Sequence, residues 1–313
     1  MSESDNWERK TLEKLAFSAL QEQRRARQWG ILFKVLTFGY LFILLFLMMG
    51  WFGHGEGPVS GKHTALVEMQ GVIAARNEAS AENVISGLQE AFKDKNTKGV
   101  ILRINSPGGS PVQSGQIYDE IKRLRAKHPE IPLYAVVEDI CASGGYYVAA
   151  AADKIYVDKA SIVGSVGVLM DSFGFTGTLD KLGVERRLLS AGENKGFLDP
   201  FSPLNGAHKE HAQTMLGEIH RQFIQAVRQG RGKRLKETPE MFSGLIWTGE
   251  KSIEMGLADA LGSMEYVARE VVKAEEIIDF TVQEGFAERF AKRLGAAMAS
   301  ANPLVQGGGI SLK

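Results

Sequence analysis

The 313-residue chain contains a single cysteine and no excess of either charge. Cys141 alone cannot form an internal disulfide or a cysteine-based zinc site, and we interpret it as a small buried hydrophobic residue. Lysine and arginine together number 37, as do aspartate and glutamate, and this net charge of zero argues against a nucleic-acid-binding protein. The glycine-bearing turns match neither a phosphate-binding P-loop nor a dinucleotide site. We therefore expect no nucleic-acid partner, no metal and no cofactor.

Charge is also scarce in one apolar run, residues 29–52, where Lys34 is the only charged residue. Its last 18 residues are uncharged and long enough to cross a bilayer as one helix. The alternatives are a buried core helix and a cleaved signal peptide. The 28 mostly polar residues before the run, and the lack of a small-residue cleavage site after it, favour an uncleaved anchor. We expect a polar leader over residues 1–28, a transmembrane helix over 29–52 and a glycine-rich linker over 53–62.

Positive charge is concentrated on the N-terminal side of this run. Six basic residues precede it: Arg9, Lys10, Lys14, Arg24, Arg25 and Arg27. On the other side, Lys62 is the only lysine or arginine before Arg76. The positive-inside rule predicts a single-pass protein with its N-terminal side in the cytoplasm. In a Gram-negative bacterium the membrane is then the inner (cytoplasmic) membrane, and residues 54–313 are periplasmic.

Beyond the linker, strand and helix patterns alternate within a chain of globular composition, 44% hydrophobic and 24% charged. Apolar and β-branched runs predict strands over residues 64–70, 99–105, 132–138, 154–157 and 277–282. Helical spacing of apolar residues predicts helices over 80–96, 112–127, 146–152, 207–229 and 263–275. This alternation predicts an α/β domain of repeated strand–helix units, with parallel strands and helical crossovers.

Three glycine-bearing turns follow predicted strands, at residues 105–110, 141–147 and 162–168. Backbone N–H groups at such turns can stabilise an oxyanion during acyl transfer, although one glycine pair is often only a tight turn. In the second turn, Ser143 lies between a strand and an alanine-rich helix and precedes two glycines. A serine at this place is either a helix N-cap or a nucleophile at a helix N-terminus, and both interpretations stay open.

A serine nucleophile needs a base. No histidine occurs between His128 and His208, and none lies in a strand-end loop, which disfavours a Ser-His-Asp triad. Lysine can act as the base in its neutral form, which burial favours. Lys195 follows an apolar segment between two glycines, and Ser165, also flanked by glycines, could orient it. A surface lysine and a turn serine are the alternatives.

Four motifs occur in a fixed order: RINSPGG at 103–109, ASGGYY at 142–147, GSVGV at 164–168 and SAGENK at 190–195. In these motifs the chain resembles the signal peptide peptidase A family, membrane-anchored bacterial serine peptidases whose fold is similar to the Clp protease and crotonase group. The resemblance covers about residues 63–285 and implies a peptidase domain there. The remaining residues, 286–313, contain a run of glycines, and we expect them to form a C-terminal helix and a mobile tail.

The resemblance implies a Ser-Lys dyad, with Ser143 as the nucleophile and Lys195 as the general base. It further implies that Ser165 orients Lys195. The backbone N–H groups of Gly109 and Gly144 are implied to form the oxyanion hole, with the neighbouring Gly108 as the alternative to Gly109.

The resemblance also implies a function and partners. The substrates would be signal-peptide remnants or other membrane-derived or unfolded peptides. A ring-like homo-oligomer, a tetramer or an octamer, would complete the substrate sites. The chain departs from the family pattern in its N-terminal 28 residues and at Gly196, where Asp is more common. Two alternatives remain: a crotonase-like acyl-thioester enzyme with the same oxyanion hole, and a non-catalytic membrane scaffold in which Ser143 is a cap and Lys195 a surface charge.

Overall fold

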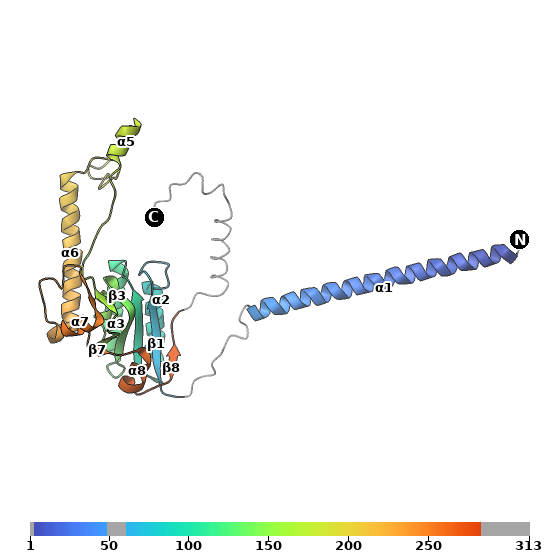
Figure 1. Ribbon diagram of the computed structural model, residues 1–313, viewed down its shortest axis with the longest axis horizontal. Helices are drawn as coiled ribbons and strands as arrows, with labels where there is room; N and C mark the ends of the chain where they lie inside the picture. Colours follow the sequence, from blue (N-terminus) through green and yellow to red (C-terminus); the bar gives the residue numbers. More distant parts are fainter. Residues whose placement is uncertain (1–2, 49–60, 283–313) are drawn as a thin grey trace. The chain divides into compact units, whose positions relative to one another are not determined.

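The structure is a computed structural model that describes residues 3–48 and 61–282 (Figure 1). It divides into two compact units, one containing the N-terminal helix and the other comprising Ser60–Gln283. Most of the predicted linker over 53–62 lies outside the described residues, as do the helix and tail predicted over 286–313.

The first unit contains one continuous helix, α1, over Glu3–Met48. Its 46 residues correspond to about 69 Å at 1.5 Å per residue, more than twice the roughly 30 Å of a bilayer core. The polar leader and the apolar run therefore share one helix. The stretch Glu13–Phe46 is long and apolar enough to cross a membrane, and the apolar window within it buries none of its residues. A helix of a soluble core would bury such side chains, so their exposure favours the predicted membrane span.

The second unit is built on an eight-stranded sheet. The strands are β1 His63–Gln70, β2 Thr97–Ser106, β3 Leu133–Ala142, β4 Lys154–Val157, β5 Ile162–Gly164, β6 Ile246–Thr248, β7 Ala260–Leu261 and β8 Ile277–Asp279. Their order is β6-β5-β3-β2-β1-β8, with β4 also paired to β3 and β7 paired to β4. The pairs are parallel except for the antiparallel pair β5–β6, as the strand–helix alternation predicts.

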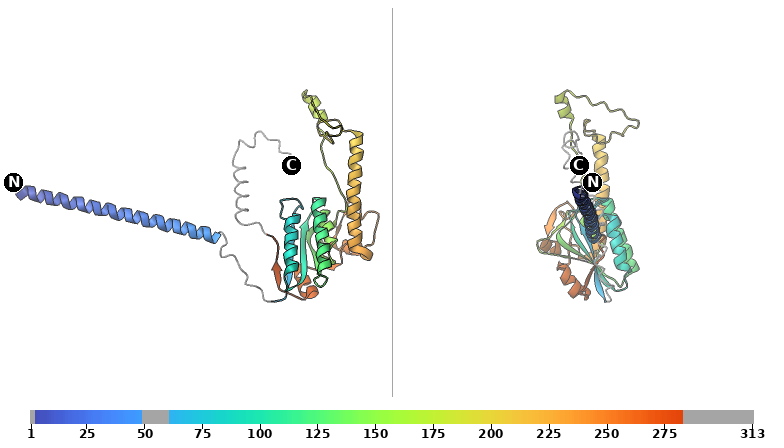
Figure 2. Two further views of the ribbon diagram at one scale, coloured as in Figure 1. Left: turned by 180° about the vertical axis from the view of Figure 1, so that it is seen from behind. Right: turned by 90° about the vertical axis from the view of Figure 1, so that its right-hand side faces the viewer.

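Helices cover both faces of this sheet. The helices of the unit are α2 Ala81–Lys93, α3 Pro111–Lys127, α4 Gly144–Ala149, α5 Thr176–Leu182, α6 Gly206–Arg231, α7 Gly249–Glu254 and α8 Met264–Tyr266, with a 3-10 turn at Gly232–Arg234 and a π-helical turn at Val267–Val272; α5 lies away from the sheet. Helices α2 and α3 pack side by side over one face (Figure 2). The π-helical turn covers part of the other face through Val267 and Ala268.

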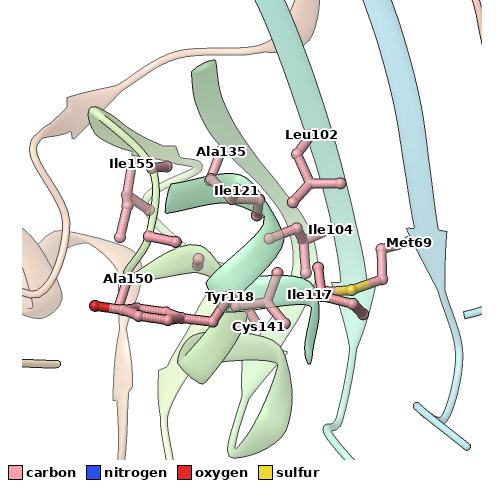
Figure 3. Packing of buried hydrophobic residues seen from close by; sticks show 14 of the residues in the cluster. Met69, Leu102, Ile104, Ile117, Tyr118, Ile121, Ala135, Cys141, Ala150 and Ile155 are labelled. Atoms are coloured by element: carbon pink, nitrogen blue, oxygen red, sulfur yellow. The ribbon is translucent and has the colours of Figure 1, made fainter. Parts of the chain in front are cut away.

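The two faces divide each central strand by alternation. In β2, Leu102 and Ile104 belong to the main core, whereas Ile101 belongs to the smaller cluster behind the sheet. Figure 3 shows Leu102 and Ile104 packed against Ile117 and Ile121 of α3. Serine side chains cap the two flanking helices: Ser80 Oγ accepts a hydrogen bond from the Asn83 N–H of α2, and Ser110 Oγ accepts one from the Gln113 N–H of α3.

The prediction of the five strands and of four helices is confirmed within a few residues at their ends. The helix predicted over 263–275 is instead a short turn followed by the π-helical turn, and the strand predicted over 277–282 ends at Asp279. Strands β5 to β7 and helices α5 and α7 were not predicted as such. They contain two to seven residues, too few for an apolar period to show.

The topology brings the three glycine-bearing turns to one edge of the sheet. Strand β3 lies between β2 and β5, and all three run parallel. At their carboxyl ends Ser106 pairs with Cys141, and Ala142 pairs with Gly164. The turns that follow these residues are therefore neighbours, as at the ligand-binding edge of other open α/β sheets.

Candidate active site

Ser143 occupies a sharp turn between β3 and α4. Its backbone has φ 51° and ψ −122°, a conformation that a residue other than glycine adopts at a cost of about 1–3 kcal/mol. The Ser143 N–H donates to the Gly164 carbonyl at 2.8 Å, and the Ser143 carbonyl accepts from the Tyr147 N–H at 2.9 Å. The side chain makes no capping hydrogen bond, so the N-cap interpretation is wrong and the hydroxyl is left unused by the helix.

Two glycines allow the neighbouring turns to close on Ser143. Gly108 has φ +101°, and a Cβ there would lie 2.7 Å from both the Gly144 nitrogen and Ser143 Cβ. A Cβ on Gly144 would lie 2.5 Å from Ser114 Oγ and 3.2 Å from the Gly109 nitrogen. No side chain fits at either position, and the backbones of the two turns lie in direct contact.

The contact between the two turns places two backbone donors, the N–H groups of Gly109 and Gly144, side by side. The Gly108 N–H donates to Ser106 Oγ at 3.1 Å and so is already used. The Ile73 N–H donates to the Gly108 carbonyl, and the parallel bridge between Ile73 and Gly109 directs the Gly109 N–H to the opposite side of the strand. Among the described residues, neither the Gly109 N–H nor the Gly144 N–H has a hydrogen-bond partner. This geometry favours Gly109 over Gly108 as an oxyanion donor.

Residues of these turns line a cleft of about 550 Å³. Four of the five predicted site residues line it: Ser143, Ser165, Gly109 and Gly144. Apolar side chains make up much of the rest of the wall: Pro111, Tyr147, Val168, Leu169, Ile219 and Phe223. Sequence reasoning missed this wall, because its residues come from four separate segments that only the fold brings together.

The aromatic part of the wall is tightly packed. The Tyr147 ring lies 5.0 Å from Phe223 of α6 and 5.5 Å from Tyr118 of α3, centroid to centroid. Burial raises the pKa of the Tyr147 phenol, with a smaller contribution from Asp119. The phenol is therefore neutral at physiological pH, and the cleft presents an uncharged surface beside Ser143.

Ser165 lies in the third turn and shares the unusual backbone of Ser143, with φ 51°. Its N–H donates to the Leu245 carbonyl at 2.7 Å, and its carbonyl accepts from the Gly167 N–H at 2.8 Å. No described side chain bonds to its hydroxyl, which is thus available to a group that enters the cleft.

The structure does not bring Lys195 into the cleft. Lys195 is exposed, in a turn where its N–H donates to the Gly192 carbonyl at 3.1 Å. The neighbouring Asn194 Oδ1 lies 3.1 Å from His208 Nε2, at the start of α6. The cleft residues Ile219 and Phe223 follow His208 by 11 and 15 residues, or about 17 and 23 Å along the helix. Within one chain, Lys195 and Ser143 are therefore well separated.

Lys195 belongs to a segment, residues 168–205, that we call the arm; it reaches the N-terminal end of α6 (Figure 1). Within the arm, Phe175 stacks on Phe201 at 5.4 Å and Arg186 pairs with Asp199, although both phenylalanine residues remain more than a third exposed. Much of its apolar surface is exposed, including Leu169, Phe173, Leu182, Leu189 and Leu204, and Leu189 is 95% exposed. Exposed apolar side chains gathered on one segment are typical of interaction surfaces.

No histidine described in the structure lines the cleft. The ring of Phe197, in the arm, packs on His208 and His211 at 5.2 and 5.7 Å, whereas His220 bonds to the carbonyl of Val166. The prediction against a Ser-His-Asp triad agrees with this placement. Over residues 3–48 and 61–282, no three His, Cys, Asp or Glu side chains are grouped so as to hold a metal ion.

Cys141 lies two residues before Ser143 but takes no part in the cleft. It is fully buried, and this burial raises the pKa of its thiol far above the usual range. The interpretation of Cys141 as a small buried hydrophobic residue is confirmed.

Two family models match the second unit. The model of peptidase family S49 matches residues 125–277, and the Clp protease model matches residues 65–162. The first includes Ser143, the arm and α6, and the second includes β2 to β4 with the turns at 105–110 and 141–147. The predicted Clp protease-like α/β fold is confirmed.

Relatives named as proteases share this part of the chain. A protein of Enterococcus faecium that bears the name of signal peptide peptidase SppA is 30% identical over 237 residues, 73% of this chain and 68% of that protein. A protein of Methanocaldococcus jannaschii named as a protease is 33% identical over 217 residues, 68% of this chain and 69% of that protein.

A relative with a different name also matches: a Brucella melitensis protein named Na(+)/H(+) antiporter NhaA is 45% identical over 209 residues, 67% of this chain. The chain spans only 28% of the length of that Brucella protein.

Proposed function

The chain belongs to peptidase family S49, a family of serine peptidases, and we propose that it is a membrane-anchored endopeptidase with Ser143 as its nucleophile. One observation carries the proposal. Ser143 is held in a strained turn with its hydroxyl unused, at a cleft where two unpaired backbone N–H groups lie side by side. A structural cap would not need this geometry, whereas an acyl-transfer site does.

The chemistry follows from the residues. Ser143 Oγ attacks the carbonyl carbon of the scissile peptide bond, and its proton passes to the neutral amine of Lys195. The N–H groups of Gly109 and Gly144 stabilise the oxyanion that forms on the carbonyl oxygen. When the C–N bond breaks, the Lys195 ammonium returns its proton to the leaving amine. Lys195 then takes a proton from the water that attacks the ester on Ser143, and it returns that proton to Ser143 Oγ as the acid is released.

Lys195 reaches this site from a second copy of the chain. The distance along α6 separates Lys195 from Ser143 within one chain, and the arm that carries Lys195 exposes apolar side chains. Packing of this arm on a neighbouring copy buries those side chains. It also brings the amine beside Ser165, which orients it, and into the drier surroundings in which a lysine loses its charge. A closed ring, a tetramer or an octamer, gives every copy the same neighbour.

The anchor and the cleft together define the substrate. Helix α1 crosses the inner membrane with its N-terminus in the cytoplasm, so the second unit lies in the periplasm. The uncharged, largely apolar wall of the cleft accepts the side chains of signal-peptide remnants and of other membrane-derived or unfolded peptides. A crotonase-like acyl-thioester function fits neither the family nor this location, since coenzyme A thioesters are cytoplasmic.

The first test is hydrolysis of an unstructured apolar peptide by the full-length chain in detergent micelles. We expect Ser143→Ala and Lys195→Ala to lower kcat by at least about a thousandfold. Ser86→Ala and Lys93→Ala, exposed positions of α2, are the matched controls and should retain activity. Continued hydrolysis by Ser143→Ala would refute the proposed nucleophile. If Ser143→Ala is inactive and Lys195→Ala remains active, Ser143 stands as the nucleophile and Lys195 is not the base. An inactive wild-type ring would support the non-catalytic scaffold.

A further inference from the structure

The turn that presents Ser165 is held in place by three hydrogen bonds to its main chain. The Ser143 N–H donates to the Gly164 carbonyl at 2.8 Å, and the Ser165 N–H donates to the Leu245 carbonyl at 2.7 Å. The third bond joins the Val166 carbonyl to His220 Nε2 at 3.1 Å. It is the only one of the three in which a side chain takes part, and it comes from α6.

The chemistry of this third bond determines which nitrogen of the His220 ring carries a proton. A carbonyl oxygen only accepts hydrogen bonds, so His220 Nε2 carries a proton and donates it. Nε2 keeps this proton whether the ring is neutral or charged. The ring is half-buried, and the α6 residues on either side of it in sequence, Ile219 and Gln222, line the cleft. His220 thus ties the helical wall of the cleft to the turn opposite.

The turn needs such a tie because its backbone is strained. Ser165 has φ 51°, which a residue other than glycine keeps only when its surroundings enforce it. Without the His220 donor, the Val166 carbonyl loses its partner beside a buried side chain, and the turn can relax toward ordinary backbone angles. Relaxation would move the Ser165 hydroxyl, and it would also move the Gly164 carbonyl that holds the Ser143 backbone.

We infer that His220 is a positioning residue of the proposed peptidase, which holds Ser165 and Ser143 in their reactive conformations through the Val166 carbonyl. The inference rests on the proposed function of Ser143. Its effect falls on the chemical step, because the bond acts directly on the turns of Ser165 and Ser143, whereas Pro111 and Tyr147 of the apolar wall belong to α3 and α4. We expect loss of the donor to lower kcat about tenfold, equivalent to about 1.4 kcal/mol, and to change KM less than about twofold.

The experiment compares donors of different reach at position 220 of the full-length chain in micelles. His220→Phe keeps a ring of similar size but removes the donor. His220→Gln restores an N–H donor at about the position of Nε2. Loss of kcat in the Phe variant, which keeps the ring, with recovery in the Gln variant, which keeps only the donor, supports the inference. His128→Phe, the same substitution far from the cleft, is the control for loss of a histidine and should leave kcat unchanged.

Two results overturn the inference. One is a Phe variant with wild-type kcat; the other is a Gln variant as slow as the Phe variant while both assemble normally. If the Phe variant fails to assemble, His220→Asn replaces it, because its shorter amide cannot reach the carbonyl, and the same comparison with Gln decides. Ser143→Ala, run in parallel, separates the two proposals. If it remains active, the proposed nucleophile is wrong; if it is inactive while His220→Phe is fully active, only the role of His220 is wrong.

Discussion

Two inactive variants of this chain should restore each other's activity when they assemble together. Along α6, about 17 to 23 Å separate the residue that holds the Lys195 turn from the residues of the cleft that contains Ser143. A lysine side chain cannot cover that distance. If a neighbouring copy supplies Lys195, a Ser143→Ala chain still offers its lysine, and a Lys195→Ala chain still offers its serine.

The expected recovery follows from counting sites. In a ring assembled at random from equal amounts of the two variants, a site is complete when its serine comes from a Lys195→Ala chain and its lysine from a Ser143→Ala neighbour. Each condition is met half of the time, so roughly a quarter of the sites are complete. We therefore expect about a quarter of the wild-type hydrolysis rate of an apolar peptide, measured after co-expression of the two full-length variants and purification in micelles.

A mixture without activity would refute this reasoning. If Lys195 served Ser143 of its own chain, every chain in the mixture would lack one member of the pair, and mixing would recover nothing. Co-assembly of Ser143→Ala with the double variant carrying Lys195→Ala as well is the control. That mixture holds no intact serine and must remain inactive. Pull-down through a tag on one variant shows that mixed rings have formed.

Three further predictions follow from the second unit. Gly108→Ala should abolish hydrolysis and destabilise the fold by about 1–3 kcal/mol, because its φ is +101° and its Cβ would meet the nucleophile's turn. Gly115→Ala is the control, because Gly115 lies in a helix and a Cβ there would be 4.0 Å from the nearest side chain. It should keep its hydrolytic activity and its thermal stability. Burial alone would raise the pKa of Asp259, but the hydrogen bonds from Arg231 and the Ile155 N–H, together with the charges of Arg231 and Arg234, outweigh it, and the net pKa is lowered. The ion pair therefore stabilises the fold above about pH 4 and is lost as the pH falls through this lowered pKa. Urea unfolding from pH 5 to 2 should show a steeper loss in wild type than in Asp259→Asn. Buried Cys141, whose thiol pKa burial raises, should react with iodoacetamide only after unfolding, as mass spectrometry can show.

The strands, the parallel sheet and the meeting of the glycine turns follow from local patterns. Parallel strands joined by helical crossovers bring their carboxyl ends to one edge, so three turns after three strands become neighbours whatever the loop details. The same pattern could not decide between a capping and a nucleophilic Ser143. That decision depends on a backbone angle and on an unused hydroxyl, which only the folded turn shows.

The cleft wall and the place of Lys195 were beyond the sequence patterns for different reasons. Helix α6 was predicted as one helix over 207–229, and nothing in its spacing showed that Ile219 would line the cleft or that Phe223 would contact Tyr147. Such contacts depend on how a long helix docks on the sheet. The motif that contains Lys195 indicates a role for the residue but no position, because position depends on the arm and on what the arm packs against.

Helix α6 connects these parts. At its start His208 contacts the turn of Lys195, in its middle His220 holds the Ser165 turn, and at its end the buried Arg231 bonds to Asp259 and to the Gly256 carbonyl. A helix transmits a displacement along its axis because its backbone is hydrogen-bonded throughout. The end of α6 is fixed in the core by Arg231, and its start contacts the arm. A neighbouring copy that binds the arm would therefore also fix the position of α6 along the cleft. Assembly would then do two things at once: it would deliver a lysine to one copy and stabilise the serine turns of the other.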